Sequence, residues 1–410
     1  MSASLDLDFV RRQFPAFSSP VLSSHAFFEN AGGSYPCQQV VDRLHRFYLD
    51  RKVQPYGPYP GAQAGGAEMD EARTRLAAMM GVAREEVSFG PSTSANTYVL
   101  AQAVRQWLRG ANAAIVVTNQ DHEANSGVWR RLADEGIEVR EWALDPSTGS
   151  LDPAELQKLL ADGKVKLVAF PHCSNVIAEI NDVAAICDIA RAAGARTVVD
   201  GVSYAPHGFP DIPALGCDVY LFSAYKTYGP HQGIMVLREA FGMELPGQAH
   251  FFNHGTLYKR HTPAGPDHAQ VAACAGMADY VDALAAAHGV SGDAAARNRA
   301  VHDLMRAQEV AVIAPLLDYL AARNDVRLIG PRDAARRAPT VAVELDRAAE
   351  PVSEELGRNG IACWAGDFYA VRPLAALGID RAKGVLRMSA THYTSTEDVA
   401  RLIAALDRVL

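Results

Sequence analysis

The 410-residue sequence predicts an α/β fold, in which a large domain built on a mostly parallel sheet is accompanied by a smaller α+β domain at the C-terminal end. Short apolar runs alternate with helical patterns from about residue 70 to about residue 240, and this alternation is typical of parallel strands covered by helices on both faces. After about residue 280, long alanine-rich helical segments surround two isolated strand candidates. We therefore expect a large domain over residues 16–280 and a small domain formed by residues 1–15 and 281–410.

The strands of the large domain are predicted from five short apolar runs, at residues 113–119, 166–172, 195–201, 218–224 and 233–237. One of the intervening helices is expected to begin at Asp152, whose carboxylate can cap the helix. Pro153 fits the first turn, and Glu155 completes a start that is like a capping box. Helical patterns of this kind between the runs favour a mostly parallel sheet.

The small domain is expected to contain strands at 339–345 and 384–390 and a final helix over 395–410. Thr394 and Glu397 stand at capping-box spacing, which predicts the helix start. Apart from these elements, the segment 51–66 is rich in glycine, proline and tyrosine, so we interpret it as a loop that can line a pocket of the same or the opposite subunit or serve as a surface connection.

Composition excludes several classes of function. The net charge of −8 offers no basic surface for nucleic acid, and no window reaches the roughly 18 apolar residues of a membrane span. The six cysteines are scattered without a CxxC pair or a His/Cys cluster, so neither a disulfide framework nor a metal site is expected. The opening segment "MSASLDLDFVRRQF" lacks a signal pattern, and we expect a cytoplasmic protein.

Polar side chains follow four of the strand candidates, where ligands collect in a parallel sheet. These side chains are an imidazole, an amide, a carboxylate and an amine, in chain order His122, Asn175, Asp200 and Lys226. Lysine is scarce in this chain, with seven in all, which makes an amine beside an apolar strand notable. The four groups are expected to meet at one edge of the sheet.

A phosphate site is predicted at the start of another helix, in the segment "VSFGPSTSANTYVLAQAV". Ser92, Thr93 and Ser94 place hydroxyl groups and free backbone N–H groups where an anion can bind. A phosphate site, a carboxylate for a ring nitrogen and a lysine able to form an imine are the requirements of pyridoxal 5'-phosphate, PLP. Taken singly, each residue has a structural interpretation as an N-cap, a core histidine, a loop residue or a solvated lysine.

The motifs together resemble the fold-type I PLP enzymes of the class V aminotransferase family, in the cysteine desulfurase-like branch. The resemblance runs in order through "FFENAGGSYP" (27–36), "SNVIAEINDV" (174–183), "VVDGVSYAPHG" (198–208), "FSAYKTYGPHQG" (222–233) and "GVLRMSATHYTSTEDV" (384–399). It implies a large domain with a sheet of the seven-stranded type, PLP as cofactor, an amino-acid substrate and a homodimer with active sites at the interface.

The resemblance also implies roles for individual residues. Lys226 matches the lysine that holds PLP as an internal aldimine and then moves the substrate's α-proton, Asp200 matches the carboxylate facing the ring nitrogen, and His122 matches the imidazole stacked on the ring. These three form the expected catalytic set. The expected cofactor-binding set adds Asn175 near the ring's 3-oxygen and the hydroxyl residues Thr93, Ser94, Ser203, Ser223 and Tyr225. The expected substrate contacts are Arg387, for the carboxylate, and Tyr369.

The sequence departs from the desulfurases at four places. Tyr369 stands where they carry the nucleophilic cysteine, and a phenol with a pKa near 10 is a poor substitute for a thiolate. Tyr225 replaces a histidine, and Ser203 replaces a glutamine. Gly265-Pro266 replaces a Gly-Thr pair that reaches the partner's phosphate, and proline supplies neither a hydroxyl nor an N–H. Cys363, six residues before Tyr369, is either a relocated nucleophile or a buried apolar residue.

The leading hypothesis is a PLP-dependent class V aminotransferase or carbon–sulfur lyase-like enzyme that acts on an amino acid. The sequence does not choose between transamination, elimination, desulfuration and racemisation. A cysteine desulfurase with a relocated thiol and a catalytically retired scaffold are the alternatives. A transcription factor is disfavoured because no basic helix-turn-helix precedes the fold, and a nicotinamide dehydrogenase is disfavoured because no GxGxxG follows a strand.

Overall fold

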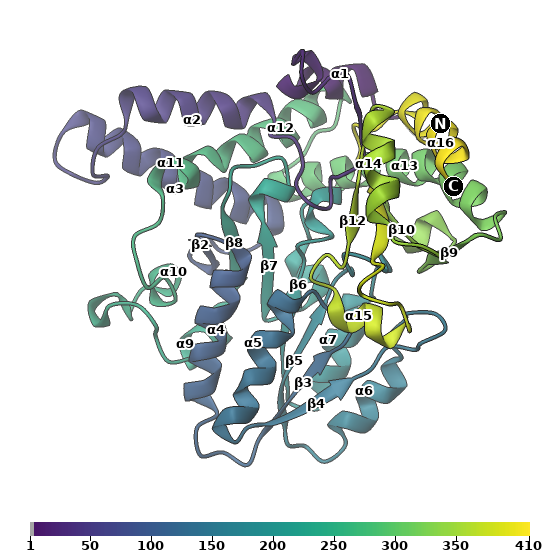
Figure 1. Ribbon diagram of the computed structural model, residues 1–410. Helices are drawn as coiled ribbons and strands as arrows, with labels where there is room; N and C mark the ends of the chain where they lie inside the picture. Colours follow the sequence, from purple (N-terminus) through teal and green to yellow (C-terminus); the bar gives the residue numbers. More distant parts are fainter. Residues whose placement is uncertain (1–3) are drawn as a thin grey trace.

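The computed structural model describes residues 4–410 and contains a 7-stranded sheet with the order β2-β8-β7-β6-β5-β3-β4 (Figure 1). All neighbouring strands are parallel except those on either side of β8, which runs antiparallel to both β2 and β7. The strands are β2 (Val87–Gly90), β3 (Ala114–Thr118), β4 (Glu138–Trp142), β5 (Val165–Pro171), β6 (Arg196–Asp200), β7 (Val219–Ser223) and β8 (Gly233–Leu237). The predicted α/β class and the mostly parallel sheet are confirmed.

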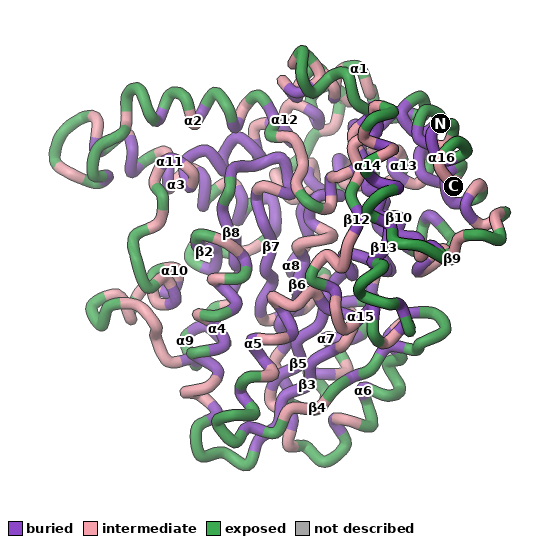
Figure 2. The backbone as a smooth tube through the Cα atoms, viewed as in Figure 1, coloured by how far each residue is buried: buried purple, intermediate pink, exposed green. Residues whose placement is uncertain are grey.

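Both faces of this sheet are buried. Alternate residues of each strand point to opposite sides, and the residues on each side pack into a different core cluster. In β3, Ala114 and Val116 belong to one core cluster, whereas Ile115 and Val117 belong to another. The second cluster includes residues of α4 (Thr93–Trp107), α5 (Gly127–Arg130) and α9 (Glu239–Glu244). The first includes residues of α6 (Pro153–Leu160), α7 (Val183–Ala192) and α8 (Ile212–Leu215). Figure 2 shows the resulting buried centre beneath partly exposed helices.

A group of helices extends the first core beyond the sheet. It consists of α2 (Gln38–Asp50), α3 (Pro60–Met80), α11 (His268–Ala273) and α12 (Ala275–Ala287), which lie side by side at one end of the molecule (Figure 1). α1 (Leu7–Arg12) contributes Val10 to the same core. The short α10 (Leu257–Arg260) lies next to β2 and α9.

The remaining elements form a smaller α+β region around a 4-stranded antiparallel sheet with the order β12-β13-β10-β9. Its strands are β9 (Val326–Ile329), β10 (Thr340–Leu345), β12 (Trp364–Gly366) and β13 (Val385–Ser389), and its helices are α13 (Ala294–Ala321), α14 (Glu350–Arg358), α15 (Val371–Ala376) and α16 (Thr396–Val409). The N-terminal β1 (Ala26–Phe27) pairs in parallel with β11 (Ile361–Ala362), and Phe28 lies in the small-region core.

Two predicted helix starts have different outcomes. Asp152 caps α6 as predicted, with its carboxylate accepting from the Ala154 N–H at 2.8 Å. The start of the last helix was predicted one residue too early, since its capping box is formed by Ser395 and Asp398. Thr394 Oγ1 instead accepts from the Thr391 N–H and closes the preceding turn. The predicted domain boundaries at residues 15 and 280 stay predictions.

Candidate active site

The carboxyl ends of the central strands surround a cavity of about 270 Å³. Every residue in the predicted cofactor-binding set lines it, namely Thr93, Ser94, His122, Asn175, Asp200, Ser203, Ser223, Tyr225 and Lys226. The lining also includes residues that sequence reasoning did not assign to a site, among them Cys173, Val202 and His231. An amine, a carboxylate, an imidazole, an amide and several hydroxyls therefore share one concave surface, which is the usual form of a small-molecule site.

Lys226 reaches this cavity from a 3₁₀ turn, Ala224–Lys226, that directly follows β7. The residue is only 9% exposed. Burial lowers the pKa of the amine to about 8, helped by the positive charge of Arg387, while Asp200 partly opposes the shift. A lysine in this range keeps a useful fraction of neutral, nucleophilic amine near pH 7.

Asp200 is the last residue of β6, and its carboxylate oxygen Oδ1 accepts from the Val202 N–H at 2.9 Å. Burial raises the pKa of this carboxyl to about 6, against the stabilising effects of the Val202 hydrogen bond and of the Lys226 charge. A cationic donor placed against Asp200 would favour its ionised form. The carboxylate is thus suited to hold a protonated ring nitrogen.

His122 and Asn175 stand after two further strands. His122 Nδ1 accepts from the Ala124 N–H at 3.1 Å, and burial, followed by the charges of Lys226 and Arg387, lowers its pKa to about 4. Its ring is therefore neutral near pH 7. Asn175 donates from Nδ2 to the Phe368 carbonyl at 2.9 Å, while its Oδ1 is buried and without a partner among residues 4–410.

Hydroxyl groups gather where α4 begins. Ser92 caps the helix by accepting from the Ala95 N–H, and the N–H groups of Thr93 and Ser94 lie ahead of the first intrahelical hydrogen bond. Thr93 Oγ1 lies 2.7 Å from Ser223 Oγ. Gly233 allows this closeness, because a Cβ there would collide with the backbone of Ser92 and Thr93. Such a helix start favours an anion.

Tyr225 stacks on His231, with ring centroids 4.9 Å apart and an interplanar angle of 9°. Burial raises the pKa of the Tyr225 phenol, so the hydroxyl stays protonated. Sequence reasoning missed His231, although it lies five residues after the lysine in the same motif. The sequence does not show that the loop after Lys226 folds back, which brings the His231 ring onto the Tyr225 ring.

The two predicted substrate contacts lie outside this lining. Arg387, on β13, is buried and donates from Nη2 to Glu29 Oε1 at 2.7 Å, while its guanidinium carbon lies 3.7 Å from the centroid of the Phe368 ring. Tyr369 is 70% exposed, and its ring centroid lies 5.4 Å from that of His122. Glu29, which sequence reasoning passed over, is thus the direct partner of Arg387.

Comparison with known proteins identifies the family. Residues 26–402 match the family model described as aminotransferase class-V. The chain belongs to the class V aminotransferase family. It is similar to the aminotransferase-like protein FGM3 of Gibberella zeae (30% identity, 100% of both chains covered) and to a cysteine desulfurase of Serratia proteamaculans (28% identity, 99% of this chain and 98% of the relative).

The fold of the solved cysteine desulfurase from Thermococcus onnurineus NA1 is similar over 99% of this chain and 98% of that one, with a TM-score of 0.85 at 22% identity. This structure shows the shared fold, and the similarity in sequence supports the cysteine desulfurase-like branch of class V. Class V aminotransferases are PLP-dependent enzymes that act on amino acids, and the chain is therefore an enzyme of this kind.

Within this class V framework, the cysteines do not provide an activated thiol in residues 4–410. Burial raises the pKa of each of the six thiols, to about 12 for Cys173 in the cavity wall and to about 12 for Cys363. Cys173 also donates to the Ala178 carbonyl at 3.1 Å. A reactive thiolate needs a lowered pKa, so neither cysteine has the environment of a nucleophile here.

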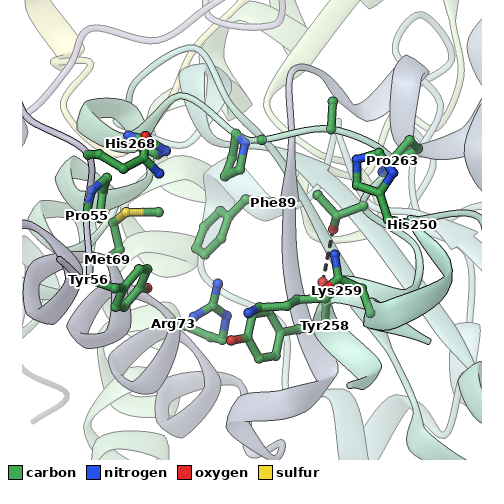
Figure 3. A pocket seen from close by; sticks show the side chains of 16 residues that line it. Pro55, Tyr56, Met69, Arg73, Phe89, His250, Tyr258, Lys259, Pro263 and His268 are labelled. Atoms are coloured by element: carbon green, nitrogen blue, oxygen red, sulfur yellow. Dashed lines mark hydrogen bonds between the residues drawn. The ribbon is translucent and has the colours of Figure 1, made fainter. Parts of the chain in front are cut away.

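Gly265 and Pro266 do not line the Lys226 cavity. They line a second cavity of about 350 Å³ and also a third of about 600 Å³, which shares His231 with the Lys226 cavity. Figure 3 shows the second cavity, with Arg73 beside Tyr258 and Phe89 between the walls. The guanidinium carbon of Arg73 lies 4.0 Å from the Tyr258 ring centroid. The predicted loop 51–66 contributes Gln54, Pro55 and Tyr56 to the same walls, while its last residues belong to α3.

In the part of the chain that the structure describes, no group of three or more His, Cys, Asp and Glu side chains is arranged to hold a metal ion. No helix within residues 4–410 combines the length and the apolar character needed to cross a bilayer. The predicted cytoplasmic location stays a prediction.

Proposed function

We propose that this class V enzyme binds PLP in the Lys226 cavity and uses it to act on an amino acid, in a transamination or carbon–sulfur lyase-like reaction. The observation that carries the proposal is the meeting of Lys226, Asp200, His122 and Asn175 with a hydroxyl-lined helix start in one cavity. When bound, PLP supplies an aldehyde that condenses with amines and a ring that accepts electrons.

The residues fit such a group by their chemistry. The N-terminus of α4, with Thr93, Ser94 and the Ser223 hydroxyl, suits the phosphate. Asp200 suits a protonated ring nitrogen, and the unpaired Oδ1 or the amide of Asn175 suits a polar ring substituent. Ser203 and Tyr225 supply further hydroxyls on the cavity wall.

The catalytic roles follow from the state of each side chain. Lys226, with its amine pKa near 8, would hold the cofactor and would move the proton at the substrate's α-carbon. His122 is neutral and presents a flat ring without a competing charge. Asp200 keeps the proton at the ring nitrogen. Arg387 binds the substrate carboxylate, and Tyr369 borders the entrance beside His122.

Incubation with PLP followed by borohydride reduction tests the proposal. We expect one stable adduct on the peptide that contains Lys226, found by mass spectrometry, and its loss in Lys226→Ala. Lys259→Ala is the matched control, since that lysine lines the neighbouring cavity. An unmodified Lys226 peptide, or an adduct that survives Lys226→Ala, would refute the proposed cofactor site.

A panel of amino acids then separates the reactions. Pyridoxamine phosphate indicates transamination, keto acid plus ammonia indicates elimination, and sulfide with alanine indicates desulfuration. The similarity to cysteine desulfurases keeps desulfuration as the second candidate. The raised pKa values of the thiols speak against it. Sulfide release that Cys363→Ser abolishes and Tyr369→Phe leaves unchanged would reverse this preference.

We also infer that the active form contains two copies of this chain. Several large apolar side chains are exposed, with Phe251 at 84%, Phe252 at 70% and Leu49 at 68%. Tyr48, Tyr56 and Tyr59 add to them from α2 and the loop that follows it. Exposed apolar side chains favour contact with another protein surface, and a two-fold dimer is the commonest way for copies of one chain to cover them. Light scattering should give the dimer mass, and Phe251→Asp with Phe252→Asp should shift it toward the monomer.

A further inference from the structure

Arg387 already has a carboxylate partner within its own chain. Its Nη2 donates to Glu29 Oε1 at 2.7 Å, and the two side chains are only 4% and 18% exposed. One face of the guanidinium is covered by the Phe368 ring. The Asn175 carbonyl lies 3.4 Å from Nη1. A substrate carboxylate that is to reach Arg387 must therefore change this arrangement.

The pair uses only part of its bonding capacity. An arginine fork can hold both oxygens of one carboxylate, but here a single hydrogen bond joins Arg387 to Glu29. Arg387 Nε and Glu29 Oε2 are both buried without a partner within residues 4–410. An unsatisfied buried charge is costly. A ligand carboxylate that takes Nε and Nη2 together would be a better partner for Arg387 than Glu29 is.

The Glu29 side chain can leave without moving its backbone. The backbone is fixed, since the Glu29 carbonyl accepts from the Gly32 N–H at 3.0 Å and Glu29 bridges to Ser389 on β13. The carboxylate itself lies over Gly32, where any Cβ would collide with Oε1. Glycine therefore creates the space for the carboxylate, and rotation of the Glu29 side chain alone releases Arg387.

The exchange also conserves charge. A substrate carboxylate carries the same charge as the Glu29 carboxylate that it replaces on Arg387. Lys226 and Asp200, whose ionisation depends on nearby charges, thus experience little net change when the carboxylates exchange. An amine without a carboxylate cannot replace Glu29 as the hydrogen-bond partner of Arg387, so the pair of Arg387 and Glu29 stays intact when such an amine binds.

We propose that Glu29 is a positioning residue, which pairs with Arg387 until the carboxylate of an amino-acid substrate displaces it. The inference rests on the proposed function in one respect, the binding of a substrate carboxylate by Arg387. Glu29 weakens the binding of every carboxylate ligand by competing with it. In the absence of substrate, Glu29 supplies an opposite charge to the buried guanidinium of Arg387.

The test measures binding rather than turnover. The probe is trifluoropropionate, whose binding to the PLP-loaded enzyme and to the cofactor-free protein is followed by fluorine NMR, with trifluoropropylamine as the ligand that lacks a carboxylate. Glu29→Gln keeps an acceptor for Nη2 but removes the competing charge. We expect it to tighten trifluoropropionate binding about tenfold, from the difference between a charged and a neutral hydrogen bond, and to leave the amine unchanged.

Glu123→Gln is the matched control, since Glu123 pairs with Arg372 near the same entrance at 3.3 Å, and it should change neither ligand. Glu29→Asp, which is too short to reach Nη2, should also tighten the carboxylate and guards against a folding defect in the amide variant. For an amino-acid substrate, Glu29→Gln should lower KM about tenfold at unchanged kcat. Unchanged or weaker carboxylate binding in both Glu29 variants would overturn the inference.

A further variant separates this inference from the function it rests on. Arg387→Gln should abolish trifluoropropionate binding if Arg387 is the carboxylate ligand. Binding that survives Arg387→Gln overturns the assigned role of Arg387, and with it the reason for the exchange. Binding that Arg387→Gln removes, while both Glu29 variants leave it unchanged, overturns the role of Glu29 alone.

Discussion

The amine of Lys226 is expected to titrate far below an ordinary lysine, and pH is the perturbation that reveals it. An amine with a pKa of 10.5 is neutral in about one molecule in 3,000 at pH 7. Burial and the Arg387 charge bring the pKa of Lys226 to about 8, which makes about one molecule in ten neutral. The site therefore holds roughly 300-fold more reactive amine than a surface lysine.

Competitive acetylation of the cofactor-free protein measures this difference. A trace of acetic anhydride is added at a series of pH values, and the labelling of each lysine peptide is read by mass spectrometry. Lys226 should reach half of its maximal labelling near pH 8. Lys158 is exposed, and its hydrogen bond to Glu155 raises the pKa of its amine, so it serves as an internal reference that titrates later. Partial burial slows the labelling of Lys226 at every pH but does not move its midpoint.

The same experiment tests the assigned causes. Asp200 opposes the shift, so Asp200→Asn should lower the Lys226 midpoint further, whereas Asp303→Asn, at a distant exposed carboxylate, should leave it unchanged. A Lys226 midpoint at or above pH 10 would refute the reasoning that burial makes this amine nucleophilic. A midpoint that rises in Asp200→Asn would refute the role given to the carboxylate.

Three further outcomes are expected. Lys226→Met should raise the free energy of unfolding at pH 7 by about 3 kcal/mol, because the wild-type amine loses its proton more readily in the folded than in the unfolded chain. The unfolded amine keeps its proton between pH 8 and 10.5, so wild-type stability rises through that window and the gain should shrink. An equal gain in urea unfolding at pH 7 and at pH 10.5 would contradict this. Arg387→Leu leaves the Glu29 carboxylate without its partner and should cost about 3–5 kcal/mol in urea unfolding, while adding Glu29→Leu should recover most of the loss rather than add to it. Tyr369→Cys places an exposed thiol beside His122 and should raise sulfide release from cysteine by about tenfold or more, measured against Tyr369→Ser, which should show no gain.

Much of the large domain could be predicted from its sequence, because buried strands and helix caps leave local patterns. The run 195–201 and the carboxylate at its end, Asp200, were placed correctly from apolar character alone. The residues grouped after the strands share one cavity for the same reason, since parallel strands end at one edge. Their catalytic and binding roles stay predictions.

Contacts between distant segments could not be predicted. Glu29 lies 358 residues from Arg387, and nothing in the local pattern of either segment signals their pairing. The carbonyl of Phe368 reaches Asn175 only because Phe368 and Tyr369 both adopt left-handed backbone conformations, with φ of 52° and 56°. Such angles are uncommon for aromatic residues, so Gly366 and Asp367 indicate a turn but not the left-handed backbone of the two residues that follow.

The pairing of β1 with β11 has a consequence for synthesis of the chain. Ala26 pairs with Ile361, so the first strand finds its partner only after about 335 more residues have been made, which takes roughly 20–70 s at the usual rates of translation. The central sheet, complete by Leu237, can form on the ribosome well before then. The segment that carries Glu29 is therefore placed last, and a truncated or stalled chain presents the Lys226 cavity without a finished binding site for carboxylates.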